Sequence, residues 1–298
     1  MRSLITGGTG FVGRHLIRKL ENPVVLSRNP EKARQIPGVT DTFAWNIDEL
    51  PHAESFEGID CIFHLAGESV FKGRWNTAKK IRIRDSRIHG TRNLVQRLST
   101  LEQPPKTLIC ASAIGYYGSR GDEELTEISH PGTDFLSTVC MAWEEEAHKA
   151  TTFGARVVQV RIGVVLGSDG GALKQMLLPF KICMGGRLGN GHQYMSWIHI
   201  DDLVELLLHA AMTQDLHGPI NGVSPHPVTN REFTKTLATA VNRPAFFPVP
   251  GSILRLVLGE FASVLLDSQR VLPEKTMQHG YTFIYPELNQ ALRSLINP

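Results

Sequence analysis

The chain has 298 residues, a formal net charge of +2, 42% hydrophobic residues and 20% charged residues, close to globular averages. No apolar run approaches the roughly 18–20 residues that cross a bilayer. The charge is spread along the chain, so neither a membrane nor a nucleic acid is expected as a partner. The four cysteines include no CxxC pair, which predicts free thiols in a reducing compartment, the cytoplasm, and no metal site.

The first half of the chain alternates short apolar runs with helix-like periodicity. Six strands are predicted at residues 2–6, 23–27, 40–45, 61–65, 107–112 and 155–161. Helices are predicted at residues 11–20, 77–100 and 134–150. Continuous apolar strands with helical connections are typical of a parallel sheet that is buried on both faces.

From about residue 165 the pattern loosens into glycine-rich loops, an apolar helix at residues 173–184 and a proline-punctuated last third. We therefore predict an α/β Rossmann fold, a doubly wound parallel sheet over residues 1–165 to which residues 197–212 return. Residues 166–298 are expected to form mainly a smaller C-terminal α+β cap. Asp201 is predicted to cap the helix that begins beside it.

The stretch TGGTGFVG places glycines at GxxGxxG spacing between the first strand and the first helix. Gly7 permits a tight turn, Gly10 lets the main chain approach a pyrophosphate, and Gly13 allows close helix packing, with the helix N-terminus facing the anion. A purely structural turn is the alternative, since glycines often precede helices. The spacing predicts a dinucleotide site with contacts from Gly7, Thr9, Gly10, Phe11, Val12 and Gly13.

Two residues at the end of the second predicted strand bear on the choice of dinucleotide. An acidic residue there would bind the ribose 2′-hydroxyl of NAD and repel a 2′-phosphate. Ser27 and Arg28 offer a hydroxyl and a guanidinium instead, which suit a phosphate ester. NADP(H) is the predicted cofactor; a solvated arginine, with NAD tolerated, is the alternative.

Further motifs follow the glycine turn: HLAGE (64–68), HGTRNL (89–94), SAIGYYG (112–118), RIGVVLG (161–167), WIHIDDLV (197–204) and NGVSP (221–225). Together they resemble the extended short-chain dehydrogenase/reductases, a group that includes nucleotide-sugar epimerases and dehydratases. The wording LAGE, MAWEEEA and GHQYMSWIHIDD is similar to the atypical branch called "epimerase family protein", whose bacterial members also carry the label SulA-like.

The resemblance implies where the cofactor lies. The fourth strand should end along its ribose and pyrophosphate, and the sixth strand should end beside the nicotinamide. The contacts expected in addition to the glycine turn are Leu65, Ala66, Gly67, Glu68, Arg87 and Ile162. The resemblance also implies a homodimer through the helices at 77–100 and 134–150.

Active members of this group move a proton with a tyrosine whose pKa is lowered by a lysine four residues later. In the matching stretch DFLSTVCMAWEEEA, Leu136 and Cys140 take these two positions, and no Tyr-x-x-x-Lys occurs anywhere in the chain. The usual serine or threonine falls on Ala113, with Ser112 before it. A cysteine in an apolar helix is expected to be inert.

Three functions stay open. Ser112, Tyr116 and Tyr117 are candidate substitutes for the missing pair, although Tyr117 suits a packing role equally well. With them, the chain would be an NADP-dependent oxidoreductase or epimerase acting on a small carbonyl or hydroxyl compound, such as a nucleotide sugar. The loop at 185–194 would form a wall of its substrate cleft. The alternatives are an NADP(H) sensor without turnover and a SulA-like interaction protein.

Overall fold

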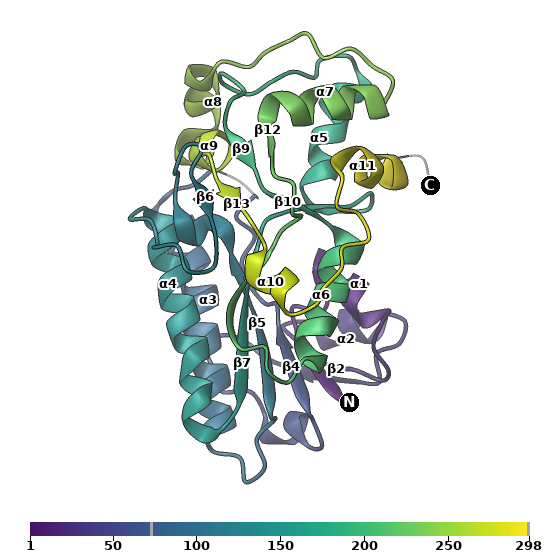
Figure 1. Cartoon of the computed structure of the whole chain (residues 1–298). Coiled ribbons are helices and arrows are strands. Elements are labelled where there is room, and N and C mark those ends of the chain that lie inside the picture. Colours follow the sequence, from purple (N-terminus) through teal and green to yellow (C-terminus); the bar gives the residue numbers. More distant parts are fainter. Residues whose placement is uncertain (72–73, 297–298) are drawn as a thin grey trace.

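The computed structural model describes residues 1–71 and 74–296 (Figure 1). Its centre is a seven-stranded sheet in the order β11-β7-β5-β4-β1-β2-β3, with every pair parallel. These strands are β1 Ser3–Thr6, β2 Val24–Ser27, β3 Asp41–Ala44, β4 Cys61–His64, β5 Thr107–Ala113, β7 Arg156–Ile162 and β11 Gly218–Gly222. The order runs outward from β1 in both directions, so the predicted doubly wound Rossmann fold is confirmed.

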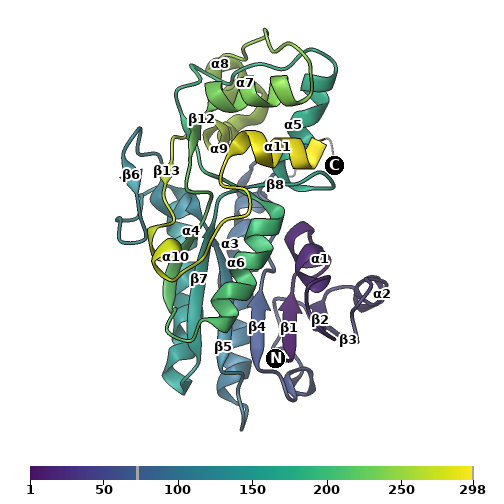
Figure 2. The ribbon, with the colours of Figure 1, turned by 45° about the vertical axis from the view of Figure 1, so that its right-hand side comes forward.

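Helices cover both faces of the sheet (Figures 1 and 2). The helices of the described chain are α1 Phe11–Ile17, α2 Pro30–Arg34, α3 Thr77–Ser99, α4 Phe135–His148, α5 Gly171–Lys181, α6 Ile200–Met212, α7 Asn230–Ala240, α8 Gly251–Leu258, α9 Ala262–Leu266, α10 Glu274–Gln278 and α11 Leu288–Ile296. Helices α3 and α4 pack on one face, and α1 and α6 pack on the other. Successive side chains of a strand point to opposite faces, which explains why the predicted strands are apolar at nearly every position.

Three two-stranded pairs connect the sheet to the cap above it. They are β8 Val164–Leu166 with β10 Trp197–His199, β9 Tyr194–Met195 with β12 Val228–Thr229, and β6 Glu124–Leu125 with β13 Arg270–Val271. Helices α5, α7, α8, α9 and α11 lie beyond these pairs, in the upper part of both views (Figures 1 and 2). The cap therefore faces the carboxyl ends of the sheet strands, the edge at which α/β proteins bind ligands.

β11 is a strand that the residue pattern does not predict. Its sequence, GPING, begins with the two residues that disfavour strands most. It pairs with β7 alone, at the edge of the sheet. Proline is tolerated on such an edge strand, because its missing N–H would otherwise point away from the sheet. Tertiary pairing decides its conformation.

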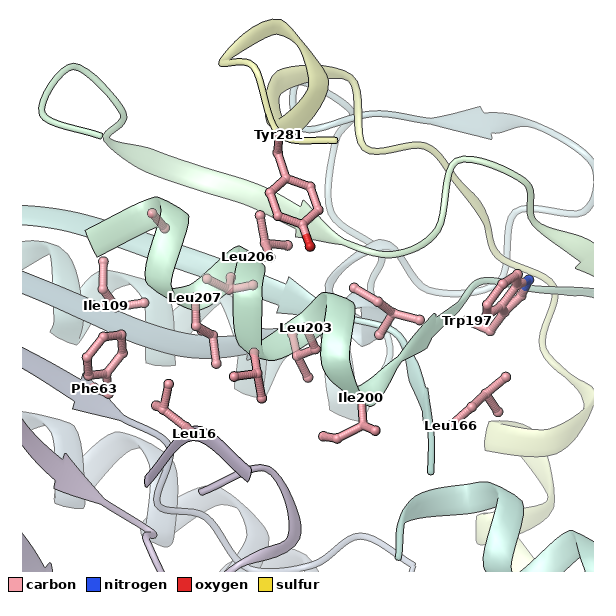
Figure 3. Packing of buried hydrophobic residues seen from close by; sticks show 14 of the residues in the cluster. Leu16, Phe63, Ile109, Leu166, Trp197, Ile200, Leu203, Leu206, Leu207 and Tyr281 are labelled. Carbon is pink, nitrogen blue, oxygen red and sulfur yellow. The ribbon is translucent and has the colours of Figure 1, made fainter. Parts of the chain in front are cut away.

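Helix α6 buries an apolar side against the sheet. Leu203, Leu206 and Leu207 are fully buried and lie in one cluster with Leu16 of α1 and Phe63 of β4 (Figure 3). Residues 197–212 thus pack over the first half of the chain. The division into two domains with the boundaries given above stays a prediction.

The residue that caps α6 is His199. The backbone N–H of Asp201 donates to His199 Nδ1 at 3.0 Å, and the helix begins at Ile200. The prediction that Asp201 is the cap is therefore wrong, because an imidazole nitrogen accepts the bond here instead of a carboxylate. Burial lowers the pKa of His199 to about 4, so the ring stays neutral and can accept. Asp201 lies in the first turn, where its charge favours the helix dipole.

No helix within residues 1–71 and 74–296 combines the length and apolarity needed to span a bilayer. Across the same residues, His, Cys, Asp and Glu side chains form no group of three or more that could hold a metal ion.

Candidate functional site

The glycine turn between β1 and α1 is held closed by main-chain contacts. Gly7 has a φ of +73°, and a Cβ there would lie 2.7 Å from the Leu65 carbonyl carbon. A Cβ on Gly13 would collide with the Gly7 carbonyl oxygen. A Cβ on Gly10 would lie 3.0 Å from the Gly7 oxygen, a tight contact, with no second close atom. Gly7 and Gly13 are therefore required by packing on several sides, whereas Gly10 is crowded by one atom only.

The N-terminus of α1 is available to an anion. Gly10 is its N-cap residue and supplies no side chain, so no side chain caps this end. The first N–H groups of a helix have no partner within the helix and carry its positive dipole end. The turn therefore has the geometry of a phosphate site.

Phe11 turns its ring away from this main-chain approach. Side chains added at Gly167, Gly170 or Gly171 would collide with or crowd its ring. The loop that precedes α5 thus packs over the first residue of α1, and a His15–Asp169 contact of 3.0 Å joins the two segments nearby. The glycines of GSDGG explain this packing, so any anion contact of Phe11 comes from its backbone N–H.

A buried histidine joins the ends of β1 and β4. His64 Nδ1 lies 2.7 Å from Thr6 Oγ1, and Nε2 lies 2.9 Å from Thr91 Oγ1 on α3. The Ala66 N–H donates to the same Thr6 hydroxyl at 3.2 Å. Burial lowers the pKa of His64 to about 4. This neutral imidazole positions the Leu65–Ala66 main chain, a role that is signalled in the sequence only by a histidine inside the apolar run CIFHL.

Ser27 is the last residue of β2 and Arg28 follows it, and the two side chains differ in their hydrogen bonding. The Ser27 hydroxyl donates to the Asn29 carbonyl and accepts from the Asn29 N–H, both at 3.1 Å. Arg28 is exposed and, among the residues that the structure describes, forms no ion pair. Its charge is nevertheless among those that lower the pKa of Glu68, after the hydrogen bond from Lys79. Arg28 therefore follows β2 with an exposed guanidinium that no carboxylate binds within residues 1–71 and 74–296.

The segment after β4 is tied to α3 by three polar contacts. Lys79 Nζ donates to Glu68 Oε1 at 2.7 Å, and the Glu68 N–H donates to Ser86 Oγ at 2.9 Å. Arg87 Nη1 donates to the carbonyl oxygens of Glu68 and Ile83. The Arg87 guanidinium lies directly against Gly67, so a Cβ on that glycine would be 3.3 Å from Cζ. Glu68 and Arg87 thus shape the main chain of this segment as well as its charge.

The Arg87 guanidinium is desolvated, and no carboxylate in the part of the chain that the structure describes is bonded to it. It lies 5.1 Å from the Trp143 ring centroid, and burial lowers its pKa. It also lies close enough to Cys140 for its charge to act on that thiol, whose pKa burial raises to about 12. Cys140 therefore stays protonated at neutral pH and is not an activated nucleophile.

A polar network lies where β5 and β7 end. Arg161 binds Glu144 of α4 with two hydrogen bonds, Nε to Oε1 at 2.9 Å and Nη2 to Oε2 at 2.8 Å. Ser112 Oγ donates to the same Oε1 at 2.7 Å. Arg161 Nη1 donates to Tyr117 Oη, which in turn donates to Asn221 Oδ1 at 2.7 Å. The Ser112 hydroxyl is therefore directed to α4 and used in the network.

The adjacent residues Tyr116 and Tyr117 differ in burial and in hydrogen bonding. Tyr117 is fully buried, and burial raises its pKa to about 12. Tyr116 is half-buried, its ring centroid lies 3.4 Å from Arg161 Cζ, and its hydroxyl has no protein hydrogen-bond partner in the described parts of the chain. Of the two phenols, Tyr116 alone combines access with an unused hydroxyl.

Leu136 and Cys140 lie beside the short helical turn Ile114–Tyr117. A Cβ on Gly115 would be 3.2 Å from Leu136 Cβ and 3.9 Å from Cys140 Sγ. The positions of the missing pair are thus next to Tyr116 but apolar. Aromatic rings continue this surface, with Trp75 5.7 Å from Phe135 and 5.9 Å from Phe261 between centroids. The sequence motifs do not reveal that Phe135 and Phe261 pack against Trp75.

Residues of the loop at 185–194 have different neighbours at its two ends. A Cβ on Gly191 would lie 3.3 Å from Arg187 and 3.4 Å from Arg231 side-chain atoms. Tyr194, in contrast, has the Arg270 guanidinium 5.1 Å from its ring centroid and lies in β9. The structure therefore separates Arg187 from Tyr194, and the loop's role as a cleft wall stays a prediction.

Comparison with known proteins decides the family. The model of the NAD dependent epimerase/dehydratase family matches residues 3–221. The chain belongs to this family. Its seven-stranded parallel sheet is that of an extended short-chain dehydrogenase/reductase. A second model, for the domain of unknown function DUF1731, matches residues 249–295, from α8 to α11.

Relatives from the epimerase family align over nearly the whole chain. Epimerase family protein YfhF of Bacillus subtilis is 38% identical and covers 99% of this chain and 98% of its own. The crystal structure of human epimerase family protein SDR39U1 with NADPH is 35% identical, covers 99% of both chains and has a TM-score of 0.88. A nucleoside-diphosphate sugar epimerase from Corynebacterium glutamicum is also 35% identical, with a TM-score of 0.81, over 58% of its own length.

Proposed function

We propose that the chain binds NADP(H) and acts as an oxidoreductase or epimerase on a small carbonyl or hydroxyl compound. The observation that carries the proposal is the turn before α1, whose N-terminus no side chain caps, together with Arg28 directly after β2, which forms no ion pair within residues 1–71 and 74–296. The human relative's structure with NADPH supports the same cofactor. NADPH, when bound, supplies a hydride to a carbonyl carbon.

Each part of the site has a task in this proposal. Backbone N–H groups of Thr9, Phe11, Val12 and Gly13 hold the pyrophosphate, since the Gly10 N–H donates to the Gly7 carbonyl at 2.9 Å. Ser27 and Arg28 hold the 2′-phosphate, which arginine can bind with two parallel hydrogen bonds. The remaining contacts, along the ribose and the nicotinamide, come from Leu65, Ala66, Gly67, Glu68, Arg87 and Ile162. The fit is supported by two features, the α1 N-terminus that no side chain caps and the exposed Arg28 guanidinium, which no carboxylate in the described part of the chain binds.

Tyr116 is the proposed proton donor. Its hydroxyl has no hydrogen-bond partner among residues 1–71 and 74–296, and its ring lies against the Arg161 guanidinium, which leaves the hydroxyl free to act as a general acid. Ser112 and Tyr117 take positioning roles in this scheme, because their hydroxyls are bonded to Glu144 and Asn221. Ser112 reaches Tyr116 through Glu144 and Arg161.

Arg87 is the proposed replacement for the missing lysine. Its charge enters from α3 and lies beside Cys140, the position that the lysine would take on α4. Carbonyl oxygens are its bonded partners, so the charge is not neutralised by a bonded carboxylate. In this scheme Arg87 holds a ribose hydroxyl and stabilises negative charge near Tyr116.

An NADP(H) sensor without turnover is the second candidate. Leu136 and Cys140 favour it, because they make the reactive side of α4 apolar. The third candidate, a SulA-like interaction protein, has no residue in the described structure that favours it.

Cofactor titration tests the proposal. NADPH and NADH are titrated against the parent protein and Arg28→Asp, with nicotinamide fluorescence as the readout. We expect the parent to favour NADPH by about tenfold or more, since the 2′-phosphate meets a charge-assisted contact, and Arg28→Asp to remove the preference. Equal affinity of the parent for the two cofactors would refute the choice of NADP(H).

A carbonyl panel separates the two main candidates. NADPH oxidation is followed after mixing the loaded protein with small aldehydes, ketones and nucleotide sugars. Turnover supports the oxidoreductase, and tight NADPH binding without oxidation on any compound supports the sensor. Light scattering on the same samples tests the proposed homodimer through α3 and α4.

A further inference from the structure

A pocket of about 780 Å³ lies on the outer side of α7, between this helix and the chain that joins it to α8. Both views place this region at the top of the molecule, far from β1 and α1 (Figures 1 and 2). Residues of the glycine turn and of the tyrosine pair do not line it. Its volume falls in the range of small-molecule sites, roughly 300–1,000 Å³.

Four cationic side chains line this basic pocket: Arg187, Arg231, Lys235 and Arg243. No carboxylate is among its lining residues, and none of the four forms an ion pair with any residue in the ranges 1–71 and 74–296. Arg231 and Lys235 are four residues apart on one side of α7, a spacing at which like charges destabilise a helix. An anion bound between them would remove this repulsion.

The two chain segments that supply the lining are basic as well, whereas residues 166–298 as a whole carry ten basic and ten acidic side chains. Residues 171–200 and 218–259 contain seven lysines and arginines and a single acid, a net charge of +6, whereas the whole chain carries +2. The single acid, Glu232, accepts hydrogen bonds from the backbone N–H and hydroxyl of Thr229 in the capping box of α7. Its carboxylate is therefore engaged and does not pair with the cations of the pocket.

Backbone hydrogen bonds hold the walls in place. The Val249 N–H donates to the Arg187 carbonyl at 2.9 Å, and the Gly189 N–H donates to the Val249 carbonyl at 2.9 Å. A side chain on Gly186 would collide with the Phe247 carbonyl. The two loops that carry Arg187 and Arg243 are thus joined, and the pocket exists without a ligand to organise it.

One side of the basic pocket is apolar. Phe246 lines it and is 79% exposed, next to Pro244, Ala245 and Ala238. An exposed aromatic ring beside several cations offers a stacking surface for a flat ring whose charged group binds the arginines. Thr234, Thr239 and Asn242 add hydrogen-bonding groups to the lining.

We propose that the basic pocket is a second ligand site, which binds a small organic phosphate that carries at least two negative charges and a flat ring. Arg187, Arg231, Lys235 and Arg243 hold the phosphate groups, and Phe246 stacks on the ring. The site is separate from the proposed cofactor turn and goes beyond the proposed function.

Calorimetric titration of the full chain tests the proposal, with ADP, inorganic pyrophosphate and adenosine as probes. NADPH is present in excess, so that ADP cannot report on the cofactor turn. We expect ADP and pyrophosphate to bind, adenosine not to bind, and both affinities to fall as salt rises. Lys235→Gln/Arg243→Gln should weaken both ligands about tenfold or more. Phe246→Ser should weaken ADP and leave pyrophosphate unchanged.

The matched control is Lys174→Gln/Lys181→Gln, which removes two exposed cations of α5 that do not line the pocket. Unchanged affinity in this control supports the proposal, and an equal loss in both double variants would overturn it. Absence of ADP and pyrophosphate binding would also overturn it, as would binding only to phosphatidylglycerol vesicles, which would indicate a membrane-docking surface. If NADPH itself does not bind, the proposed function fails, whereas pocket-dependent ADP binding would still stand.

Discussion

Arg161 and Glu144 form a bidentate ion pair in the interior, with side chains that are only 3% and 12% exposed. The pair joins β7 to α4 and also holds Ser112 and Tyr117 through their hydroxyls. Removing one partner leaves the other charge buried, which typically costs about 3–5 kcal/mol. We therefore expect Glu144→Gln and Arg161→Met each to lower the free energy of unfolding by about that amount, measured by urea denaturation.

The exposed pair Arg120–Glu123 provides the control for this prediction, with side chains 31% and 49% exposed. Exposed pairs contribute about 0–1 kcal/mol, so Glu123→Gln should change stability little. Equal effects of Glu123→Gln and Glu144→Gln would contradict the central role of the buried pair.

Gly10 and Gly13 of the turn should respond differently to alanine. Gly13→Ala forces the Gly7 carbonyl to move, so both stability and NADPH affinity should fall, by about 1–3 kcal/mol in stability. Gly10 has a φ of −74°, which alanine adopts readily. Gly10→Ala should lower the melting temperature less than Gly13→Ala, because its Cβ meets only the Gly7 oxygen, at 3.0 Å. It should weaken NADPH about tenfold or more, because its methyl group stands in the pyrophosphate approach. A Gly10→Ala protein that binds NADPH normally would refute this use of the turn.

The two tyrosines should separate catalysis from packing. Tyr117→Phe removes a hydroxyl that donates to Asn221 and accepts from Arg161. It should lower stability by about 1–3 kcal/mol, the cost of leaving buried polar groups unsatisfied. Tyr116→Phe should leave stability unchanged and abolish turnover in the carbonyl assay. Full activity of Tyr116→Phe would remove Tyr116 as proton donor.

His64 predicts a loss of stability in mild acid. Its folded pKa of about 4 lies below the ordinary value near 6.5. Between these values the unfolded chain binds a proton that the folded chain does not, so stability is full above about pH 6.5 and falls as the pH drops toward 4. The loss between pH 7 and pH 5 should be about 2 kcal/mol from this residue.

His64→Gln keeps hydrogen-bonding groups and cannot titrate, so denaturant unfolding of this variant should show a correspondingly smaller change with pH. His199, whose pKa burial also lowers to about 4, accounts for part of the change that remains. An unchanged pH profile in His64→Gln would exclude His64 as a source of the acid sensitivity.

The six predicted strands and the main helices of the first half follow from local pattern, because a strand covered by helices on both sides is apolar on both faces. The same argument fails at β11 and at the cap of α6. GPING becomes a strand because β7 offers its edge, and His199 caps α6 because burial keeps its ring neutral. Neither cause acts between neighbours in the sequence.

The glycine turn shows how much of the candidate site a sequence motif can predict. The tight turn predicted at Gly7 is matched by the close approach of Leu65, and the close packing predicted at Gly13 is matched by the close approach of the Gly7 carbonyl oxygen. Phe11 differs, because its ring is enclosed by glycines more than 150 residues further along the chain. The cofactor contacts and the homodimer stay predictions.

By itself the sequence determined the Rossmann sheet, the dinucleotide turn and the loss of the Tyr-x-x-x-Lys pair, since these depend on periodicity and on residues close together in the chain. Only the tertiary structure decided that Tyr117 is bonded and Tyr116 is free, that Arg87 brings its charge beside Cys140, and that four cap cations surround one pocket. Each of these depends on burial and on distances between side chains from separate elements, which local pattern does not contain.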